Sequence, residues 1–261
     1  MKLVPYMSYW TNGYAANPSP FIINLHKLSS YFLLKNFGEV HFITDTKGAE
    51  IFKDIKWTSI SEGLNEVDSK YSQTWSISKL YAYGQIAEKK QPFIHVDYDV
   101  FLYEGIGNIS NSAIFAQSPE NAVNYFYEIE KLERHCPNLH IINNSKPEYA
   151  VNVGVIGGHD TDFIRKYSKS AIQFVEDPSN QDFWTHYHGF KHNQWTKAVI
   201  AEQYYLSAIA KFYDKKIDFV FPNGWPSNEE AMAKKYTHLM GAKNQYGISE
   251  KIENLVQRLN L

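Results

Sequence analysis

The stretch from residue 92 to residue 102 constrains this chain more than any other. An apolar run there ends in Asp97-Tyr98-Asp99, and apolar residues then resume. Because successive strand residues point to opposite faces, Asp97 and Asp99 can share one side of a strand while Tyr98 takes the other. A buried, unpaired carboxylate costs far too much free energy. The pair therefore either binds a hard divalent cation, such as Mg²⁺ or Mn²⁺, or lies at a solvated strand-to-turn junction.

Strand-like and helix-like segments alternate through the first 105 residues. The chain favours strands over residues 3–10, 39–45, 57–60 and 92–102, with helices over 20–37, 48–55 and 76–88. Ser19 and Pro20 form a typical helix start, and Gly38 is a typical helix stop. This alternation predicts an α/β fold of Rossmann type, in which a mostly parallel sheet carries helices on both faces.

Ligands of such sheets bind beyond the carboxyl ends of the strands. The residues at those ends are Trp10, Asp45 and the Asp97–Asp99 pair, so we expect them to line one crevice.

The second half of the chain breaks the simple alternation. It favours strands over residues 108–115, 149–158 and 216–221, with helices over 121–133, 161–175, 196–212 and 249–259. Ser227 and Glu230 have the spacing of a capping box and open a further short helix. We find no repeat and no linker, and we expect one domain over residues 1–261.

The segment from 177 to 195 is predicted to be an aromatic-rich loop that carries Trp184, His186, His188 and His192. Its aromatic side chains suit a packed aromatic subdomain about as well as they suit stacking on an acceptor sugar.

Composition excludes several classes of protein. A formal net charge of -2 gives no support for nucleic-acid binding. A single cysteine, Cys136, excludes an internal disulfide and indicates a reducing compartment. No stretch approaches the ~20 apolar residues of a membrane span, and the N-terminus lacks the apolar core of a signal peptide. We expect a cytoplasmic protein, for which peripheral contact with a membrane stays open.

A second group of polar residues lies near the C-terminus, where His238 precedes Gly241 and Lys243. Neutral imidazole is a metal ligand, glycine lets the backbone approach a phosphate, and lysine offers a point charge to phosphate oxygens. Each residue alone is an ordinary surface or turn residue. Together with the upstream carboxylates they indicate a site for a metal and a diphosphate.

The order of these motifs resembles the nucleotide-sugar glycosyltransferases of the GT-A fold. The run Asn152-Val153-Gly154-Val155 lies between the Asp-x-Asp and the late His-x-x-Gly, as in the retaining glycogenin and lipopolysaccharide galactosyltransferase group. The likeness extends in order over most of the chain, but only short motifs match. The late lysine is one residue closer to the glycine than in that group.

The resemblance implies roles for individual residues. It implies that Asp97, Asp99 and His238 hold Mn²⁺ or Mg²⁺ on a nucleoside diphosphate sugar, with a uridine nucleotide favoured. It implies a nucleotide-binding half over residues 1–105 and an acceptor-binding half over 106–261. Further residues are predicted to bind the donor, either from the resemblance or from their position at a strand end. They are Ser8, Tyr9, Trp10, Asp45, Lys79, Asp97, Asn152, Gly154, Gly241 and Lys243.

Sugar transfer needs charge stabilised on the leaving phosphate, and an inverting enzyme also needs a carboxylate base. Our candidates for that base are Glu202 first and Asp160 second; Glu202-Gln203 is at best an analogue of the Asp-Gln motif of the resembled group. A retaining enzyme, which the resemblance favours, needs no such base. Trp184 and His188 are our candidates for binding a glycan or lipid-linked acceptor.

Other classes of function stay open at this stage. A nucleotidyltransferase shares the fold type but would show a glycine-rich, basic loop after the first strand, where this chain has Thr11-Asn12-Gly13-Tyr14. A non-catalytic nucleotide- or carbohydrate-binding protein would tolerate loss of Asp97 and Asp99. A metal-dependent phosphohydrolase would cluster its carboxylates and histidines at other spacings.

Overall fold

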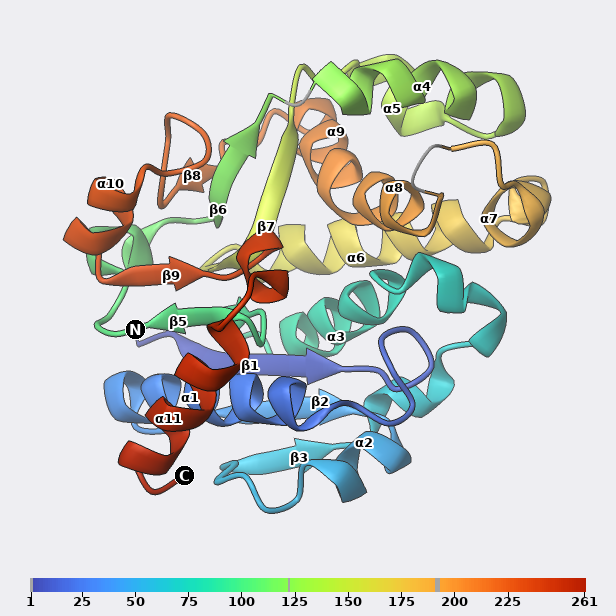
Figure 1. The fold of residues 1–261 in the computed structure, drawn as a ribbon. Helices are drawn as coiled ribbons and strands as arrows, with labels where there is room; N and C mark the ends of the chain where they lie inside the picture. The colour runs from blue at the N-terminus through green and yellow to red at the C-terminus, as the bar shows by residue number, and fades with distance from the viewer. Residues whose placement is uncertain (1, 122, 191–192) are drawn as a thin grey trace.

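The protein was analysed as a computed structural model that describes residues 2–121, 123–190 and 193–261. Within these residues a seven-stranded sheet has the order β3-β2-β1-β4-β7-β6-β8, and a two-stranded sheet pairs β5 with β9 (Figure 1). The strands are β1 (Val4–Tyr9), β2 (His41–Thr44), β3 (Ser59–Ser61), β4 (Phe93–Val96), β5 (Val100–Leu102), β6 (Phe115–Glu120), β7 (Ala150–Gly158), β8 (Asp218–Phe219) and β9 (Tyr236–His238).

Helices connect most of these strands. They are α1 (Pro20–Phe37), α2 (Thr46–Ile51), α3 (Ile77–Glu88), α4 (Val123–His135), α5 (His140–Ser145), α6 (Thr161–Glu176), α7 (Gln181–His186), α8 (Asn193–Val199), α9 (Tyr205–Phe212), α10 (Asn228–Ala233) and α11 (Ile248–Arg258). A π-helical turn, Ile200–Tyr204, joins α8 to α9. Among the described residues, no helix is long and apolar enough to cross a membrane.

The predicted α/β class with a mostly parallel sheet is confirmed. Strands β1, β2, β3 and β4 pair in parallel, whereas β7 runs antiparallel to both β4 and β6. The chain adds β2 and β3 on one side of β1 and then returns to add β4 on the other side. This reversal places a topological switch point between β1 and β4, and ligands of such sheets bind there, beyond the carboxyl ends.

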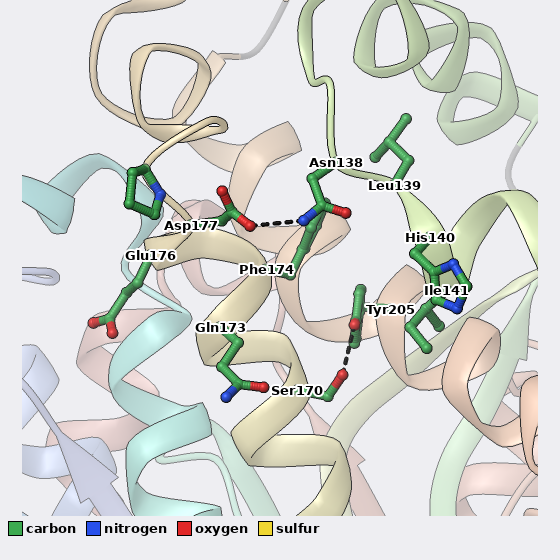
Figure 2. Close-up of a pocket in the computed structure, with 11 residues that line it drawn as sticks. Asn138, Leu139, His140, Ile141, Ser170, Gln173, Phe174, Glu176, Asp177 and Tyr205 are labelled. Carbon is green, nitrogen blue, oxygen red and sulfur yellow. Dashed lines mark hydrogen bonds between the residues drawn. The ribbon is translucent and has the colours of Figure 1, made fainter.

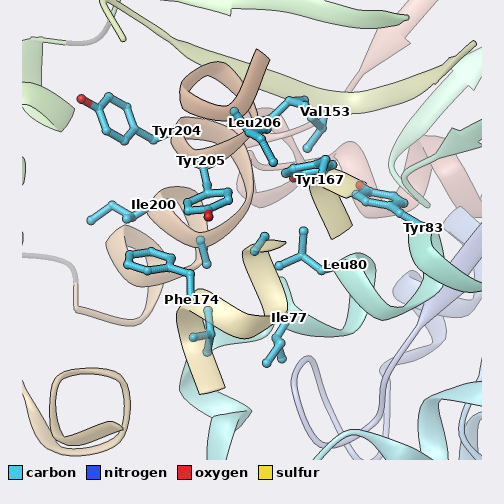
Figure 3. Packing of buried hydrophobic residues seen from close by; sticks show 14 of the residues in the cluster. Ile77, Leu80, Tyr83, Val153, Tyr167, Phe174, Ile200, Tyr204, Tyr205 and Leu206 are labelled. Atoms are coloured by element: carbon cyan, nitrogen blue, oxygen red, sulfur yellow. The ribbon is translucent and has the colours of Figure 1, made fainter. Parts of the chain in front are cut away.

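Helices cover both faces of the sheet, as expected. Met7 of β1 and Ile94 of β4 pack in one buried cluster with residues of α1, whereas Tyr6 and Phe93 pack in another with residues of α3, α6 and α9. Figure 3 shows part of the second cluster, in which aromatic and aliphatic side chains from these helices meet. The alternation follows from the period-two geometry of a strand.

Several local predictions are confirmed. The Ser19 hydroxyl accepts a hydrogen bond from Ile22 N at the start of α1, and Gly38 ends that helix with a φ of 78°. That left-handed conformation is one that glycine adopts without steric cost. The capping box of Ser227 and Glu230 is present at the start of α10.

The structure corrects other expectations. Residues 107–111 form a 3₁₀ turn, and the predicted strand over 108–115 is instead β6, from Phe115 to Glu120. A short helix that the sequence did not predict, α5, lies before Pro147. The expected loop over 177–195 contains α7 and the first turn of α8, while His192 lies outside the described residues.

Candidate metal centre

The two carboxylates lie in a tight turn, not within a strand as their spacing suggested. β4 ends at Val96, and the Val100 N–H donates to Asp97 O at 3.0 Å. Strand β9 is antiparallel to β5, with His238 opposite Val100, and the Leu239 N–H donates to Asp99 O at 2.9 Å. This pairing brings the late histidine to the turn.

Asp97, Asp99 and His238 together form the candidate metal centre. Each offers one ligand atom, and these atoms lie within 4.8 Å of one another. Two carboxylate oxygens and one imidazole nitrogen are a donor set that suits Mn²⁺ or Mg²⁺, which commonly complete their shell with water and phosphate. The three residues could therefore hold a divalent cation, in agreement with the predicted metal ligands.

Asp99 is held as a carboxylate. His238 Nε2 lies 3.5 Å from Asp99 Oδ1, and Lys243 Nζ lies 2.8 Å from Asp99 Oδ2. Burial acts to raise the pKa of Asp99, but the protonated form of His238 and the Lys243 ammonium outweigh it, so the pKa lies well below its usual range. An ionised Asp99 is the form that a cation requires.

Lys79 links the metal centre to a buried glutamate. Its Nζ lies 2.8 Å from Asp97 Oδ1 and 3.0 Å from Glu202 Oε1. The Tyr83 hydroxyl also donates to Glu202 Oε1, at 2.8 Å. Burial raises the pKa of Glu202 to about 7, against the opposing effect of Lys79. For Lys79, burial acts to lower the pKa, but the two carboxylates more than compensate and raise it.

A cavity of about 400 Å³ opens over this cluster. Its walls combine carboxylates, lysines and aromatic rings from segments far apart in the chain. The residues that line it are Tyr14, Trp75, Lys79, Asp97, Tyr98, Asp99, Asn152, Gly154, Trp195, Val199, Gln203, His238, Met240, Gly241, Lys243 and Asn244.

Eight residues predicted for the donor or the metal thus meet in one cavity. They are Lys79, Asp97, Asp99, Asn152, Gly154, His238, Gly241 and Lys243. Asn152 is buried there, and its side-chain amide donates to Glu120 Oε1 at 2.6 Å while its carbonyl accepts from Gly154 N at 2.9 Å. The carboxyl end of β4 and the late motif therefore meet at the same place.

Residues predicted at the ends of β1 and β2 do not line this cavity. The Asp45 carboxylate caps α2 through Gly48 N at 2.7 Å and also accepts from the Thr11 hydroxyl at 2.7 Å. Tyr9 and Trp10 are each only 1% exposed, and the Ser8 hydroxyl is 2.9 Å from His95 Nε2. These residues are buried and lie outside the lining of the cavity.

The predicted bases and acceptor residues are also placed elsewhere. Asp160 caps α6 through Phe163 N at 2.9 Å and pairs with Lys215 at 2.7 Å. Glu202 is fully buried, and its carboxylate pairs with Lys79 at 3.0 Å. Trp184 is completely buried and donates its indole N–H to Phe174 O at 3.3 Å, so it belongs to the core. His188 is exposed outside the cavity.

Sequence reasoning missed several residues of the cavity. Tyr14 and Trp75 contribute adjacent rings, with centroids 5.1 Å apart. Lys243 Nζ lies 5.4 Å from the centre of the Tyr98 ring. The high aromatic content of 16% hinted at such walls, but no spacing in the sequence marks these positions.

A second cavity, of about 480 Å³, lies along α6 and α9 beside α5 (Figure 2). Several of its polar groups bond to one another: Asn138 Nδ2 donates to Asp177 at 2.7 Å, and Ser170 Oγ lies 2.8 Å from the Tyr205 hydroxyl. Its lining includes none of the metal-centre residues.

Comparison with known proteins gives similarity to solved structures and a match to one family. No curated protein matches the chain. The apo form of mouse xyloside xylosyltransferase 1 is similar, with a TM-score of 0.45 and 11% sequence identity over 84% of this chain and 85% of that one. The family model that matches describes a family of unknown function, DUF6734, and it matches residues 12–260, so the chain belongs to that family.

Proposed function

We propose that this protein is a metal-dependent glycosyltransferase that transfers a sugar from a nucleoside diphosphate sugar to a glycan or lipid-linked acceptor. One observation carries the proposal: the Asp97–Asp99 turn, His238 and Lys243 meet at one cavity beyond the carboxyl end of β4. Asp99 and His238 are 139 residues apart in the sequence. The resemblance of the motif order to the retaining glycosyltransferases supports the same reaction and favours uridine diphosphate as the carrier.

The site residues divide the work of binding the donor. Asp97, Asp99 and His238 would hold Mn²⁺ or Mg²⁺, which when bound neutralises charge on the leaving diphosphate. Lys243 provides a further positive charge at the same edge of the cavity, and Gly241 has open space at its Cα, where a diphosphate can approach the backbone. Asp97, Asp99 and His238 are brought together by the fold before the substrate arrives, as electrostatic stabilisation requires.

The environment of Lys243 supports its assignment to the diphosphate. Its Nζ lies 2.8 Å from Asp99 Oδ2. Burial acts to lower the pKa of Lys243, but Asp99 and Tyr98 raise it above its usual range. Lys243 therefore stays charged while a diphosphate binds. A short movement of its flexible side chain would exchange one carboxylate contact for a phosphate contact.

We also propose that transfer retains the configuration of the sugar. Among the described residues that line the cavity, the carboxylates are Asp97 and Asp99, both of which are assigned to the metal. An inverting enzyme would need a further carboxylate facing the acceptor. Glu202 and Asp160 are both engaged elsewhere, as a buried ion-pair partner and as a helix cap.

The acceptor is proposed to enter along the aromatic side of the cavity. Trp195 lines the cavity and is 45% exposed, and Trp225, which is 48% exposed, lies 5.5 Å from the ring of His238. Exposed indole rings present flat apolar faces of the kind on which sugar rings stack. These two residues replace Trp184 and His188 as our candidates for acceptor binding.

The experiment is calorimetric titration with UDP, GDP and ADP, each with Mn²⁺ and with chelator, on the wild type and on Asp99→Ala. We expect one nucleotide to bind in a metal-dependent manner and the variant to lose that binding. If a folded wild-type protein bound none of the three nucleotides, the transferase proposal would be abandoned.

A further inference from the structure

Gln117 makes two hydrogen bonds that bear directly on the metal centre. This residue of β6 is completely buried, and its side-chain carbonyl Oε1 lies 2.6 Å from the Tyr236 hydroxyl and 2.8 Å from His238 Nδ1. An amide carbonyl oxygen only accepts hydrogen bonds. Nδ1 of His238 must therefore carry a proton and donate it.

The second ring nitrogen then faces the carboxylates. His238 Nε2 lies 3.5 Å from Asp99 Oδ1, on the side of the metal centre. In a neutral imidazole, only one nitrogen carries a proton and the other offers a lone pair. We propose that Gln117 is a positioning residue that holds His238 in the Nδ1–H tautomer and so presents Nε2 to a divalent cation.

The backbone around Gln117 is shaped to allow this contact. The pairing of β6 with β7 is irregular here: Ala116 lies opposite Ile156, and Ser118 lies opposite Asn152. Such bulges re-aim a side chain relative to regular pairing. The bulge directs Gln117 across β7 at Gly154.

Gly154 supplies the space for both partners. A Cβ atom on this residue would lie 2.4 Å from Gln117 Oε1 and 2.7 Å from His238 Cε1. Both separations are shorter than van der Waals contact, so a side chain at this position would push the amide and the imidazole apart. The missing side chain explains why a glycine occupies a buried position in the middle of a strand.

The inference rests on the metal site of the proposed function, but it has its own test. In metal sites, a hydrogen-bonded partner of the ligating histidine fixes the tautomer and the ring orientation, and its loss typically weakens metal binding 10–100-fold. Gln117 lies outside the cavity lining and contacts His238 directly. Its effect must therefore pass through His238.

The first measurement uses metal-free protein. Two-bond ¹H–¹⁵N NMR correlations of His238, recorded at a pH where the ring is neutral, are expected to show the Nδ1–H tautomer in the wild type. Gln117→Met keeps the approximate volume but removes the acceptor, and we expect it to shift the ring toward Nε2–H. Gln117→Glu keeps an acceptor at the same place and is expected to preserve the wild-type tautomer.

Tyr236→Phe is the matched control, because it removes the other hydrogen bond to the same oxygen and leaves His238 untouched. We expect this variant to keep the Nδ1–H tautomer. An Nε2–H tautomer in the wild type, or the same tautomer in wild type and Gln117→Met, would overturn the inference. Near-ultraviolet circular dichroism verifies that each variant is folded.

The second measurement is Mn²⁺ binding, followed by electron paramagnetic resonance of the free ion without nucleotide. We expect Gln117→Met to bind Mn²⁺ about 10–100-fold more weakly than the wild type, and Gln117→Glu to bind at least as well as the wild type. Equal affinity of Gln117→Met and wild type would refute the ligand role of His238 Nε2. A wild type that holds the Nδ1–H tautomer but binds no Mn²⁺ would instead refute the metal site of the proposed function.

Discussion

Lys79 offers the sharpest energetic test of the site, because it is a buried cation between two carboxylates. We consider Lys79→Met, which keeps the length of the side chain and removes the charge. The ammonium lies 2.8 Å from Asp97 and 3.0 Å from Glu202. At an effective dielectric constant of about 20, each attraction is roughly 5–6 kcal/mol before desolvation is subtracted.

The free-energy cost of Lys79→Met arises mainly at Glu202. Asp97 keeps a side chain that is 23% exposed and can be solvated, whereas the side chain of Glu202 is 1% exposed. After the substitution, the hydrogen bond from the Tyr83 hydroxyl is the contact of the Glu202 carboxylate that remains among the described residues. Leaving one partner of a buried ion pair uncompensated typically costs about 3–5 kcal/mol, and we expect that loss of unfolding free energy at pH 8.

Urea denaturation of four proteins measures this effect: the wild type, Lys79→Met, Glu202→Gln and the double variant. Because Glu202→Gln removes the stranded charge, we expect the double variant to recover more than half of the loss. Lys53→Met is the control, since Lys53 pairs with Glu50 on the exposed surface, and its denaturation midpoint is expected to stay unchanged. Additive losses in the double variant would refute the picture of a coupled buried pair.

Three further predictions concern the same framework. The pKa of Glu202 is raised from 4.5 to about 7 on folding, so the folded state binds this proton more tightly than the unfolded state does. The free energy of unfolding is therefore expected to fall as the pH rises from about 4.5 to 7. Urea titrations across this range are expected to show a smaller fall for Glu202→Gln. Gly154→Ala is expected to weaken Mn²⁺ binding at least 10-fold, whereas Gly105→Ala, which meets no atom within 4 Å, is expected to bind Mn²⁺ like the wild type. Ser227→Ala removes the capping box of α10 and is expected to cost about 1 kcal/mol in thermal unfolding, with Mn²⁺ binding unchanged.

Local chemistry accounts for the parts of the fold that the sequence predicted. Ser19 and Gly38 bound α1 because a hydroxyl cap and a left-handed glycine satisfy the backbone groups at the two helix ends. The buried run before Asp97 is a strand because apolar residues on both faces fit a sheet covered by helices on both sides.

Tertiary packing decides the parts that could not be predicted. The position of Glu202 within a π-helical turn, and its burial against Lys79 and Tyr83, depend on how α3 packs against the segment that joins α8 to α9. Trp184 looked like an acceptor residue because composition alone does not separate a buried indole from an exposed one. Here its hydrogen bond to Phe174 O marks it as core.

No sequence pattern predicts the contact between Gln117 and His238. A single glutamine in a strand has no motif, and its contact with His238 exists only because the β6–β7 pairing is irregular and Gly154 lacks a side chain. Pairwise contacts of this kind join residues 121 positions apart. They become visible only once the register of the sheet is known.

The most direct test of the central claim is anomalous X-ray diffraction from crystals of the protein grown with Mn²⁺ and UDP. The account predicts one manganese peak within coordination distance of Asp97, Asp99 and His238 Nε2, with the diphosphate oxygens completing its shell beside Lys243. A manganese peak elsewhere, or UDP bound away from this cavity, would contradict it.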